Sequence, residues 1–303
     1  MTAGSGPAVH VALAVGLTAV STAAVLVRLV DGVSSLAIAF WRITFAAVLF
    51  APLLLSKRRR EALAGLSTSA RWRLLGAGVF LGAHFALWIT SLQYTSVASS
   101  VLLVTTNPIW VGLLSPWLIG ERPTRRTWVG ILVAMIGAVI VGFEADTGEY
   151  ANPALGNALA LAGGLAASGY LMMSRSVRPS LDFGAYSAAT MAGAWVVLAL
   201  VVVVSGVPLS GYEASAWGLF AAMALGPQLL GHGSLVWALR WVGADVVAVV
   251  LLGEPIGAAI LAWYVLGEVP PDAAWMGGPL LLVGIGIVLS AGARPPQVSE
   301  SDT

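Results

Sequence analysis

The chain contains the signature Gly-Glu-x-Pro twice, at residues 120–123 and at residues 267–270. Further pairs match at the same offset of 147 positions: Pro108 with Pro255, Trp128 with Trp275, Gly130 with Gly277, and Gly137 with Gly284. Self-similarity at a fixed offset indicates internal duplication. About half of the chain is therefore predicted to be a copy of the other half. Each half holds five apolar segments, and an odd number inverts the second copy across a membrane, as is typical of transporters.

The composition is that of an integral membrane protein. Of the 303 residues, 58% are hydrophobic and only 10% are charged, whereas roughly 25% of the residues in a soluble domain are charged. Such a chain cannot cover a water-facing surface, so we expect the lipid bilayer as its solvent. The net charge of +1 argues against nucleic acid as a partner. The absence of cysteine excludes disulfides and thiolate chemistry.

The apolar segments are long enough to cross a bilayer, for which a helix needs about 20 residues. Ten are predicted, at 9–30, 35–55, 73–93, 97–119, 126–143, 154–174, 183–205, 215–237, 243–266 and 275–292. Continuous apolar runs without period-2 alternation indicate helices. The predicted fold is an all-α polytopic membrane protein whose ten transmembrane helices form two inverted five-helix repeats. The repeats are expected at 9–143 and 154–292, followed by a cytoplasmic tail at 293–303.

The orientation follows from the basic residues, which gather on the cytoplasmic side of a membrane. With a cytoplasmic N-terminus, the inside loops and tail hold 13 of the 15 Lys and Arg residues. The outside loops are mainly acidic. The first Gly-Glu-x-Pro is followed by Arg125 and Arg126, whereas Asp272 and Ala273 stand at those positions after the second. We therefore expect a multi-pass protein of the cell (inner) membrane with both termini in the cytoplasm.

Together, the ten spans, the paired prolines and the twin Gly-Glu-x-Pro followed by Trp-x-Gly resemble the EamA-type transporters of the drug/metabolite transporter superfamily. That family commonly has an aromatic-Arg pair in the second span, as in Trp41-Arg42, and a Glu-Pro in the ninth, as in Glu254-Pro255. The resemblance covers about 9–292. It implies a substrate cavity between the repeats and export of amino acids or other small metabolites.

Arg42 and Glu254 carry charge away from the ends of their predicted spans, where each charge costs about 2.5–3.5 kcal/mol on insertion scales. Glu254 lies near the middle of its span and is the first candidate for proton coupling or for binding a substrate amine. The alternative is a neutral carboxylic acid that donates to a backbone carbonyl. Arg42 cannot deprotonate, so it needs a partner. It either binds a carboxylate or another anion in the cavity, or serves as a structural counter-ion between helices.

His84 lies in the middle of the third span, with Trp88 one turn later on the same face. It is the second candidate for proton coupling, and the alternative is a single hydrogen bond across a helix interface. His232, four residues after Gln228, is expected to be structural or to line a gate. Trp110 and Trp195 also lie deep in their spans and are predicted, with Trp88, to line the substrate pathway. The alternative for these rings is packing or lipid contact.

Asn107-Pro108 is the equivalent of Glu254-Pro255 in the first repeat. Proline in both copies predicts bent helices at matching positions, and one ionisable group against one amide suits a single titrating site. Glu121 and Glu268 are expected to be structural, either capping the N-terminus of a following helix or pairing with an arginine; gating is the alternative. The small residues at 156, 160, 164 and 168 predict close helix packing.

Enzyme motifs are absent, and we expect neither a cofactor nor a metal site. Without an ATP site, uphill transport must use an ion gradient. The sequence therefore predicts a secondary-active transporter that exports a small metabolite by alternating access, with protons as the candidate coupling ion. An uncoupled facilitator is one alternative, and a membrane sensor or scaffold is another. A homodimer is left open.

Overall fold

A computed structural model describes residues 7–118, 124–142, 150–177, 180–238, 250–251 and 253–291. These residues contain helices and turns but no strand. In chain order the elements are α1 (Pro7–Ser21), α2 (Ala23–Arg28), α3 (Ser35–Phe50), the 3-10 helix η1 (Ala51–Leu55), α4 (Lys57–Ala64), α5 (Thr68–Ser91), α6 (Val97–Val104), α7 (Asn107–Leu118), α8 (Arg125–Gly142), α9 (Pro153–Val177), α10 (Phe183–Val204), α11 (Ala214–Met223), the π-helix η3 (Ala224–His232), α12 (Gly233–Ala238), α14 (Glu254–Leu266) and α15 (Asp272–Ala291).

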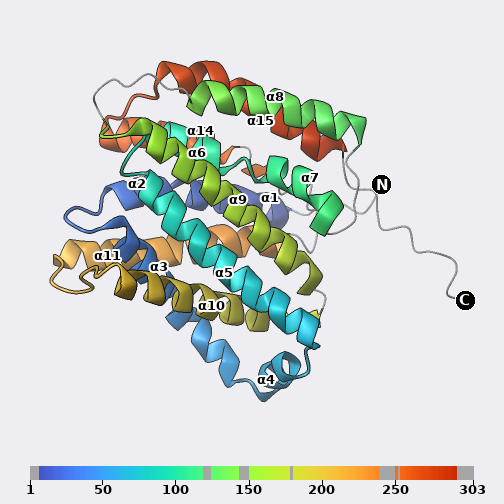
Figure 1. The fold of residues 1–303 in the computed structure, drawn as a ribbon. Coiled ribbons are helices and arrows are strands. Elements are labelled where there is room, and N and C mark those ends of the chain that lie inside the picture. Colours follow the sequence, from blue (N-terminus) through green and yellow to red (C-terminus); the bar gives the residue numbers. More distant parts are fainter. Residues whose placement is uncertain are drawn as a thin grey trace, which may run out of the picture.

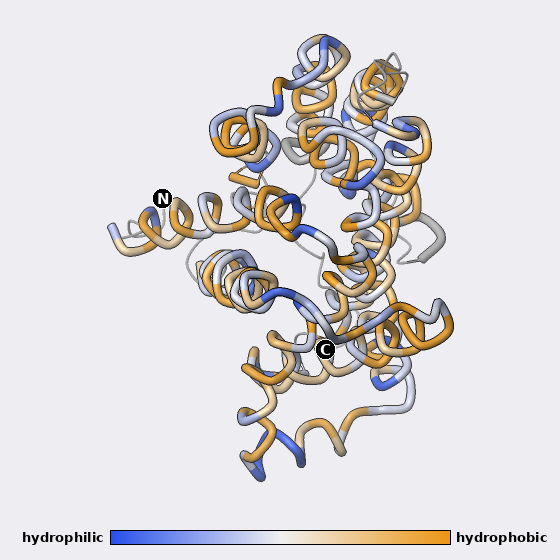
Figure 2. Tube along the Cα trace, turned by 90° about the vertical axis from the view of Figure 1, so that its left-hand side faces the viewer, coloured by the Kyte–Doolittle hydropathy of each residue, from blue (hydrophilic) through white to orange (hydrophobic). Residues whose placement is uncertain are grey.

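The predicted all-α membrane protein is confirmed. Helices long and apolar enough to cross a bilayer cover Pro7–Arg28, Ser35–Leu55, Thr68–Ser91, Pro153–Ser174 and Phe183–Val204. Most other predicted spans correspond to shorter helices or to helices in pieces. Figure 2 shows hydrophobic residues along the helices and hydrophilic residues mainly in the connecting segments. The first Gly-Glu-x-Pro, the start of the ninth span and the tail lie outside the described residues.

Helices at equivalent positions of the two halves pack against each other. α3 contacts α10 and α8 contacts α15. In the equivalent fourth and ninth spans, α6 contacts α14, whose own equivalent by the offset is α7. Two further contacts are related by the repeat. α5 packs along α9, and α1, the counterpart of α9, packs along η3 and α12, the counterparts of α5. Figure 1 shows α8 lying along α15 at the top of the view and α5 beside α9 in the centre. The halves therefore form one interleaved bundle rather than two separate domains.

The contact between α8 and α15 depends on glycines that match in the repeat. A Cβ atom on Gly284 would lie within 3 Å of the backbone of Ala134, and one on Gly137 would lie equally close to the backbone of Leu281. Gly277 meets the carbonyl oxygen of Gly137 in the same way. Small residues allow helix backbones in a membrane to approach closely. The duplicated glycines thus hold the fifth helix of one half against the fifth helix of the other.

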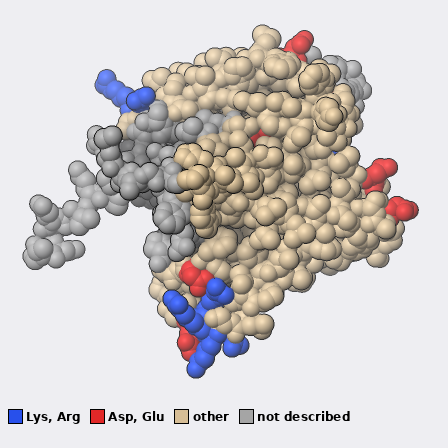
Figure 3. Space-filling model, turned by 180° about the vertical axis from the view of Figure 1, so that it is seen from behind, with Lys and Arg blue, Asp and Glu red and all other residues tan. Residues whose placement is uncertain are grey.

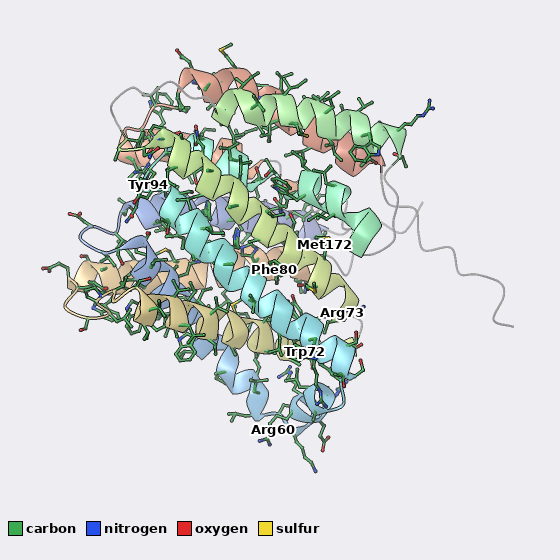
Figure 4. The ribbon with its side chains drawn as sticks, viewed as in Figure 1. Arg60, Trp72, Arg73, Phe80, Tyr94 and Met172 are labelled. Atoms are coloured by element: carbon green, nitrogen blue, oxygen red, sulfur yellow. The ribbon has the colours of Figure 1, made fainter. Side chains whose placement is uncertain are left out.

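The small-residue stripe of α9 contacts the chain around α6. Gly156 lies against the backbone of Tyr94 and Thr95, just before α6, and Gly164 against the carbonyl oxygen of Val104 at its end. Close packing of this stripe is therefore confirmed. On the other side of α9, Gly169 receives the ring of Phe80 from α5, and Figure 4 shows this part of the α5–α9 contact.

Charges separate toward opposite ends of the bundle. In Figure 3 the Lys and Arg atoms gather at the upper and lower left, whereas the charged atoms visible at the right-hand edge belong to Asp and Glu. α5 runs between the two ends, with Arg73 and Trp72 at its start and Tyr94 beyond its other end (Figure 4). At the basic end Asp182 caps α10, accepting from the Ala185 N–H at 3.0 Å, and pairs with Arg59 at 3.1 Å. The hydrogen bond from the Ala185 N–H is the largest cause that lowers the pKa of Asp182, and the hydrogen bond from Arg59 lowers it further.

We predict that Gly284→Ala destabilises the protein, because the added methyl group must push α15 away from Ala134. Overpacking of this kind costs about 1–3 kcal/mol. The melting temperature of the purified protein in detergent, followed by tryptophan fluorescence, should fall. Gly218→Ala in α11 is the matched control, because nothing lies within 4 Å of its Cβ position. Equal melting temperatures for the two variants would show that the α8–α15 contact does not limit stability.

Candidate functional site

The guanidinium of Arg42 lies at the centre of a buried cluster. Arg42 projects from α3 with only 1% of its surface exposed. Its Cζ atom lies 4.5 Å from the ring centroid of Phe85 and 5.6 Å from that of Trp88, both on α5. Its Nη2 atom lies 3.5 Å from Oε1 of Gln228 on η3. A desolvated cation over an aromatic ring gains about 2 kcal/mol, so two rings offset a cost of about 2.5–3.5 kcal/mol for placing the charge in the membrane.

Several donors in this cluster have no acceptor. Arg42 Nε, Arg42 Nη1 and Trp88 Nε1 are buried and make no hydrogen bond within the part of the chain that the structure describes. The contact to Gln228 is at the long limit for a hydrogen bond. Each unpaired buried donor costs about 1–3 kcal/mol. The rings therefore compensate the charge of Arg42 but not its hydrogen-bonding capacity.

Glu254 is the first residue of α14 and is half-buried. It interacts electrostatically with Arg42, yet no ion pair within 4 Å joins the two among the described residues. A helix N-terminus carries a partial positive charge, so α14 and Arg42 both produce positive potential at the carboxyl group. Glu254 and Arg42 therefore form a loosely coupled pair of opposite charges.

Both helices that contain the repeated prolines start at the residue just before the proline. α6 ends at Val104, a turn follows, and α7 begins with Asn107 and Pro108. In the second half, Gly253 forms a turn and α14 begins with Glu254 and Pro255. Proline is well tolerated in the first turn of a helix, where its missing N–H leaves no bond unmade. The fourth span is thus broken into two helices at this point rather than bent within one.

In the first half, the Asn107 side chain hydrogen-bonds backbone carbonyl groups at the helix break. In the amide orientation that suits its neighbours, its side-chain nitrogen donates to Val104 O and Thr105 O, each at 3.1 Å. The single Ser168 hydroxyl hydrogen is shared between Gly164 O at 2.8 Å and Asn107 O at 3.1 Å. Glu254 has no donor hydrogen at this position unless its carboxyl group is protonated. The side chain at the break is therefore always a donor in the first half, and is a donor in the second half only when Glu254 is protonated.

His84 is oriented by the neighbouring helix. Its Nδ1 atom donates to Gly163 O of α9 at 3.0 Å, since a carbonyl can only accept. Its ring stacks on Trp88 with centroids 6.0 Å apart and an interplanar angle of 4°. His232 stands at the end of η3 with an exposed side chain and shares electrostatic interactions with Arg42 and His84. Both histidines therefore lie within the electrostatic range of Arg42, and one of them is fixed by a helix–helix hydrogen bond.

The other two tryptophans lie elsewhere. Trp110 donates to Thr106 Oγ1 at 3.1 Å and borders a cavity of about 370 Å³ between α7, α8 and α9, lined almost entirely by apolar atoms. Trp195 is 38% exposed on α10 and donates to Thr44 Oγ1 at 3.0 Å. Of the three deep tryptophans selected from the sequence, only Trp88 contacts Arg42 in the described residues.

Sequence reasoning missed two contacts of Arg42. Phe85 was overlooked, although its spacing from Trp88 places both rings on one face of α5. Gln228 was noted only as a neighbour of His232. Its approach depends on the π-helical turn around Pro227 in η3, and hydropathy carries no signal for such a turn. π-helical segments occur frequently at functional sites.

The second Gly-Glu-x-Pro joins three helix ends. Glu268, just beyond α14, accepts a short hydrogen bond from the N–H of Val97, the first residue of α6. It also pairs with Arg28 at the end of α2, at 3.5 Å. Arg28 in turn donates to Thr95 O at 2.8 Å and lies over the ring of Tyr150 at 5.1 Å. The structural role predicted for Glu268 is confirmed, but the capped helix belongs to the other half of the chain rather than following in sequence.

A family model described as the EamA-like transporter family matches residues 6–143 and, separately, residues 154–290. The chain belongs to this family. EamA-like transporters are polytopic membrane proteins built from two repeats, and in general they are not enzymes. The two matches agree with the duplication inferred from the signature.

Relatives of this EamA-like transporter are transporters as well. "Uncharacterized transporter YwfM" of Bacillus subtilis is 23% identical over 239 residues, 74% of this chain and 75% of that protein. An uncharacterized transporter of Archaeoglobus fulgidus is 24% identical over 291 residues, 90% of this chain and 93% of its own length. A riboflavin transporter of Rhizobium johnstonii is 28% identical over 103 residues, 34% of this chain and 33% of that protein.

One solved crystal structure shares the fold, with a TM-score of 0.62 and 17% sequence identity, over 94% of this chain and 99% of the other. Together with the apolar helices, these relatives support a transport role, a membrane-embedded chain and a small-molecule substrate.

We predict that Glu268→Ala lowers the melting temperature of the EamA-like transporter in detergent. The N-cap of α6, Ser96, remains in the variant. The variant removes the acceptor of the Val97 N–H, a hydrogen bond to a charged group worth about 1.5–3 kcal/mol, and leaves the partly buried Arg28 without its carboxylate. Glu61→Ala is the control, because Glu61 pairs with Lys57 at 3.7 Å on the surface, where such pairs contribute about 0–1 kcal/mol. A drop no larger than that of the control would contradict the structural role of Glu268.

Proposed function

We propose that this EamA-like transporter is a secondary-active exporter of a small metabolite that works by alternating access in the cell (inner) membrane, with both termini in the cytoplasm. The orientation is supported by the positive-inside distribution of Lys and Arg. The repeats are proposed at 9–143 and 154–292, with the cytoplasmic tail at 293–303. The observation that carries the proposal is the electrostatically coupled pair of the buried Arg42 and the half-buried Glu254, beside the turn at Gly253 that precedes α14. Transporters of inverted-repeat architecture bind substrate at such broken helices near the membrane midplane.

The proposed substrate pathway contains the residues selected from the sequence, namely Arg42, His84, Trp88, Asn107, Trp110, Trp195 and Glu254. Pro108 and Pro255 mark the two helix breaks. Among these residues, Arg42, Trp88, His84 and Glu254 are linked by ring contacts or electrostatic interactions, which supports a central site at this place.

Glu254 is the proposed proton-coupling residue, and His84 is the second candidate. Glu254 makes no hydrogen bond within the described residues, and a gained or lost proton alters its electrostatic interaction with Arg42. His84 already donates to Gly163 O, which favours Glu254. Protonation of Glu254 would let it donate at the break, as Asn107 does permanently in the other half. A proton could in this way change the hydrogen bonding at the start of α14 during the transport cycle.

We predict that overexpression of the wild type protects cells against at least one amino acid or drug in a metabolite-resistance screen, and that Glu254→Gln removes most of this protection. Glutamine keeps the size and polarity of the side chain but cannot release a proton. Glu61→Gln serves as the control because Glu61 is exposed on α4. Full protection by Glu254→Gln would remove Glu254 from the mechanism.

Proteoliposomes distinguish the coupled exporter from an uncoupled facilitator. With a compound found in the screen, we expect an imposed pH gradient to drive uptake or release in the wild type several-fold above the rate without a gradient. Glu254→Gln should retain only the gradient-independent rate. A wild type that ignores the gradient would be a facilitator, and gradient dependence in Glu254→Gln would transfer the coupling role to another group.

A further inference from the structure

The cluster around Arg42 contains donors that lack acceptors. Among the described residues, Arg42 Nε, Arg42 Nη1 and Trp88 Nε1 are buried without a hydrogen-bond partner, and the Arg42 Nη2 atom lies 3.5 Å from Gln228 Oε1. Trp88 is 4% exposed and its ring lies 5.6 Å from the guanidinium carbon. The missing partner must therefore supply several acceptor atoms to neighbouring N–H groups.

Charge and shape narrow the class of this partner. The rings of Phe85 and Trp88 lie 4.5 and 5.6 Å from the guanidinium carbon but offer no oxygen acceptor, and Nε and Nη1 have no hydrogen-bond partner among the described residues. A planar group with two oxygens matches that fork with two parallel hydrogen bonds. The negative charge of Glu254 already acts on Arg42, so beside an ionised Glu254 a monoanion leaves one excess negative charge in a low-dielectric site, and a dianion such as phosphate leaves two. With Glu254 protonated, a monoanion neutralises Arg42 and a dianion does not. A monoanion with two coplanar oxygens is the better complement.

We propose that Arg42 and Trp88 form a subsite for the carboxylate group of the transported molecule, so that the substrate class is small organic carboxylates. This inference rests on the proposed function and assigns the chemistry of its central site. The carboxylate accepts two hydrogen bonds from the Arg42 guanidinium and a third from Trp88 Nε1. Gln228, already beside Nη2, keeps the guanidinium in place.

Glu254 distinguishes two sources of the carboxylate. A simple acid brings only negative charge, which the ionised Glu254 repels. An amino acid also brings an ammonium group, which Glu254 attracts. Replacement of Glu254 by glutamine should therefore strengthen binding of a simple acid and weaken binding of an amino acid.

The test measures binding to the purified full-length protein in lipid nanodiscs by titration calorimetry, without any gradient. The probes are two matched pairs, benzoate with benzamide and L-phenylalanine with L-phenylalaninamide. We expect at least one acid to bind saturably and at least tenfold more tightly than its amide. Arg42→Lys, which keeps the charge but loses the fork, should weaken that acid at least tenfold. Trp88→Phe, which keeps a ring but loses the donor, should weaken it several-fold.

Control variants keep the result interpretable. Arg58→Lys on α4 and Trp72→Phe at the start of α5 make the same chemical changes at exposed positions and should leave binding unchanged. Melting curves identify any site variant that is unfolded, and Trp88→Phe and Arg42→Lys test the subsite independently. Equal binding of acid and amide in both pairs, binding of neither acid, or unchanged acid binding in both folded site variants would overturn the proposal.

The outcome is separable from that of the proposed function. With Glu254→Gln, tighter benzoate binding assigns simple acids, and weaker phenylalanine binding assigns amino acids; both results support the carboxylate subsite. Loss of resistance in Glu254→Gln cells without any acid preference in nanodiscs would leave the transporter proposal intact and reject the subsite. Acid preference without gradient-dependent transport would support the subsite and reject the secondary-active exporter.

Discussion

A positive charge that cannot be removed, placed inside a membrane-embedded bundle, determines how the centre of this protein is built. Only 1% of the surface of Arg42 is exposed, and guanidinium groups do not deprotonate in proteins. Three elements adjust to it. α5 presents Phe85 and Trp88, the π-helix η3 brings Gln228, and α14 begins at Glu254 within electrostatic range. The π-helical turn has a local cause, since Pro227 offers no N–H to a regular α-helical ladder.

The duplication supplies the scaffold in which this charge is placed. The equivalent helices α3 and α10, and α8 and α15, pair across the two halves, as do α6 and α14 from the equivalent fourth and ninth spans. The glycines that match in sequence meet at the α8–α15 contact. Pairing of this kind fixes the two helix breaks near each other, because α6 leads into one and α14 starts at the other. The helix N-termini at these breaks supply positive potential without a charged side chain.

How much the sequence could reveal depended on the range of each interaction. Span length and the 147-residue offset predicted the helical bundle and its duplication, because burial in lipid and covalent repetition both leave local traces. Arg42, Trp88 and Glu254 were selected because a charge or ring deep in a span is conspicuous. Their mutual placement could not be predicted, since it follows from which helix faces which. The contact of Glu268 with Val97 spans 171 positions in the chain, so only the type of role, and not its partner, was accessible.

The broken symmetry of the repeats has an electrostatic reason. The first half has Arg42, while the position 147 residues later is Ala189; the second half has Glu254, while the position 147 residues earlier is Asn107. A second arginine and a second glutamate inside the bundle would each add a desolvation cost of several kcal/mol. One cation from one half and one anion from the other leave the cluster neutral overall. Structural devices such as the α8–α15 glycines can be kept in both copies because they carry no charge. The central site had to diverge, and its two charges therefore come from opposite halves of the chain.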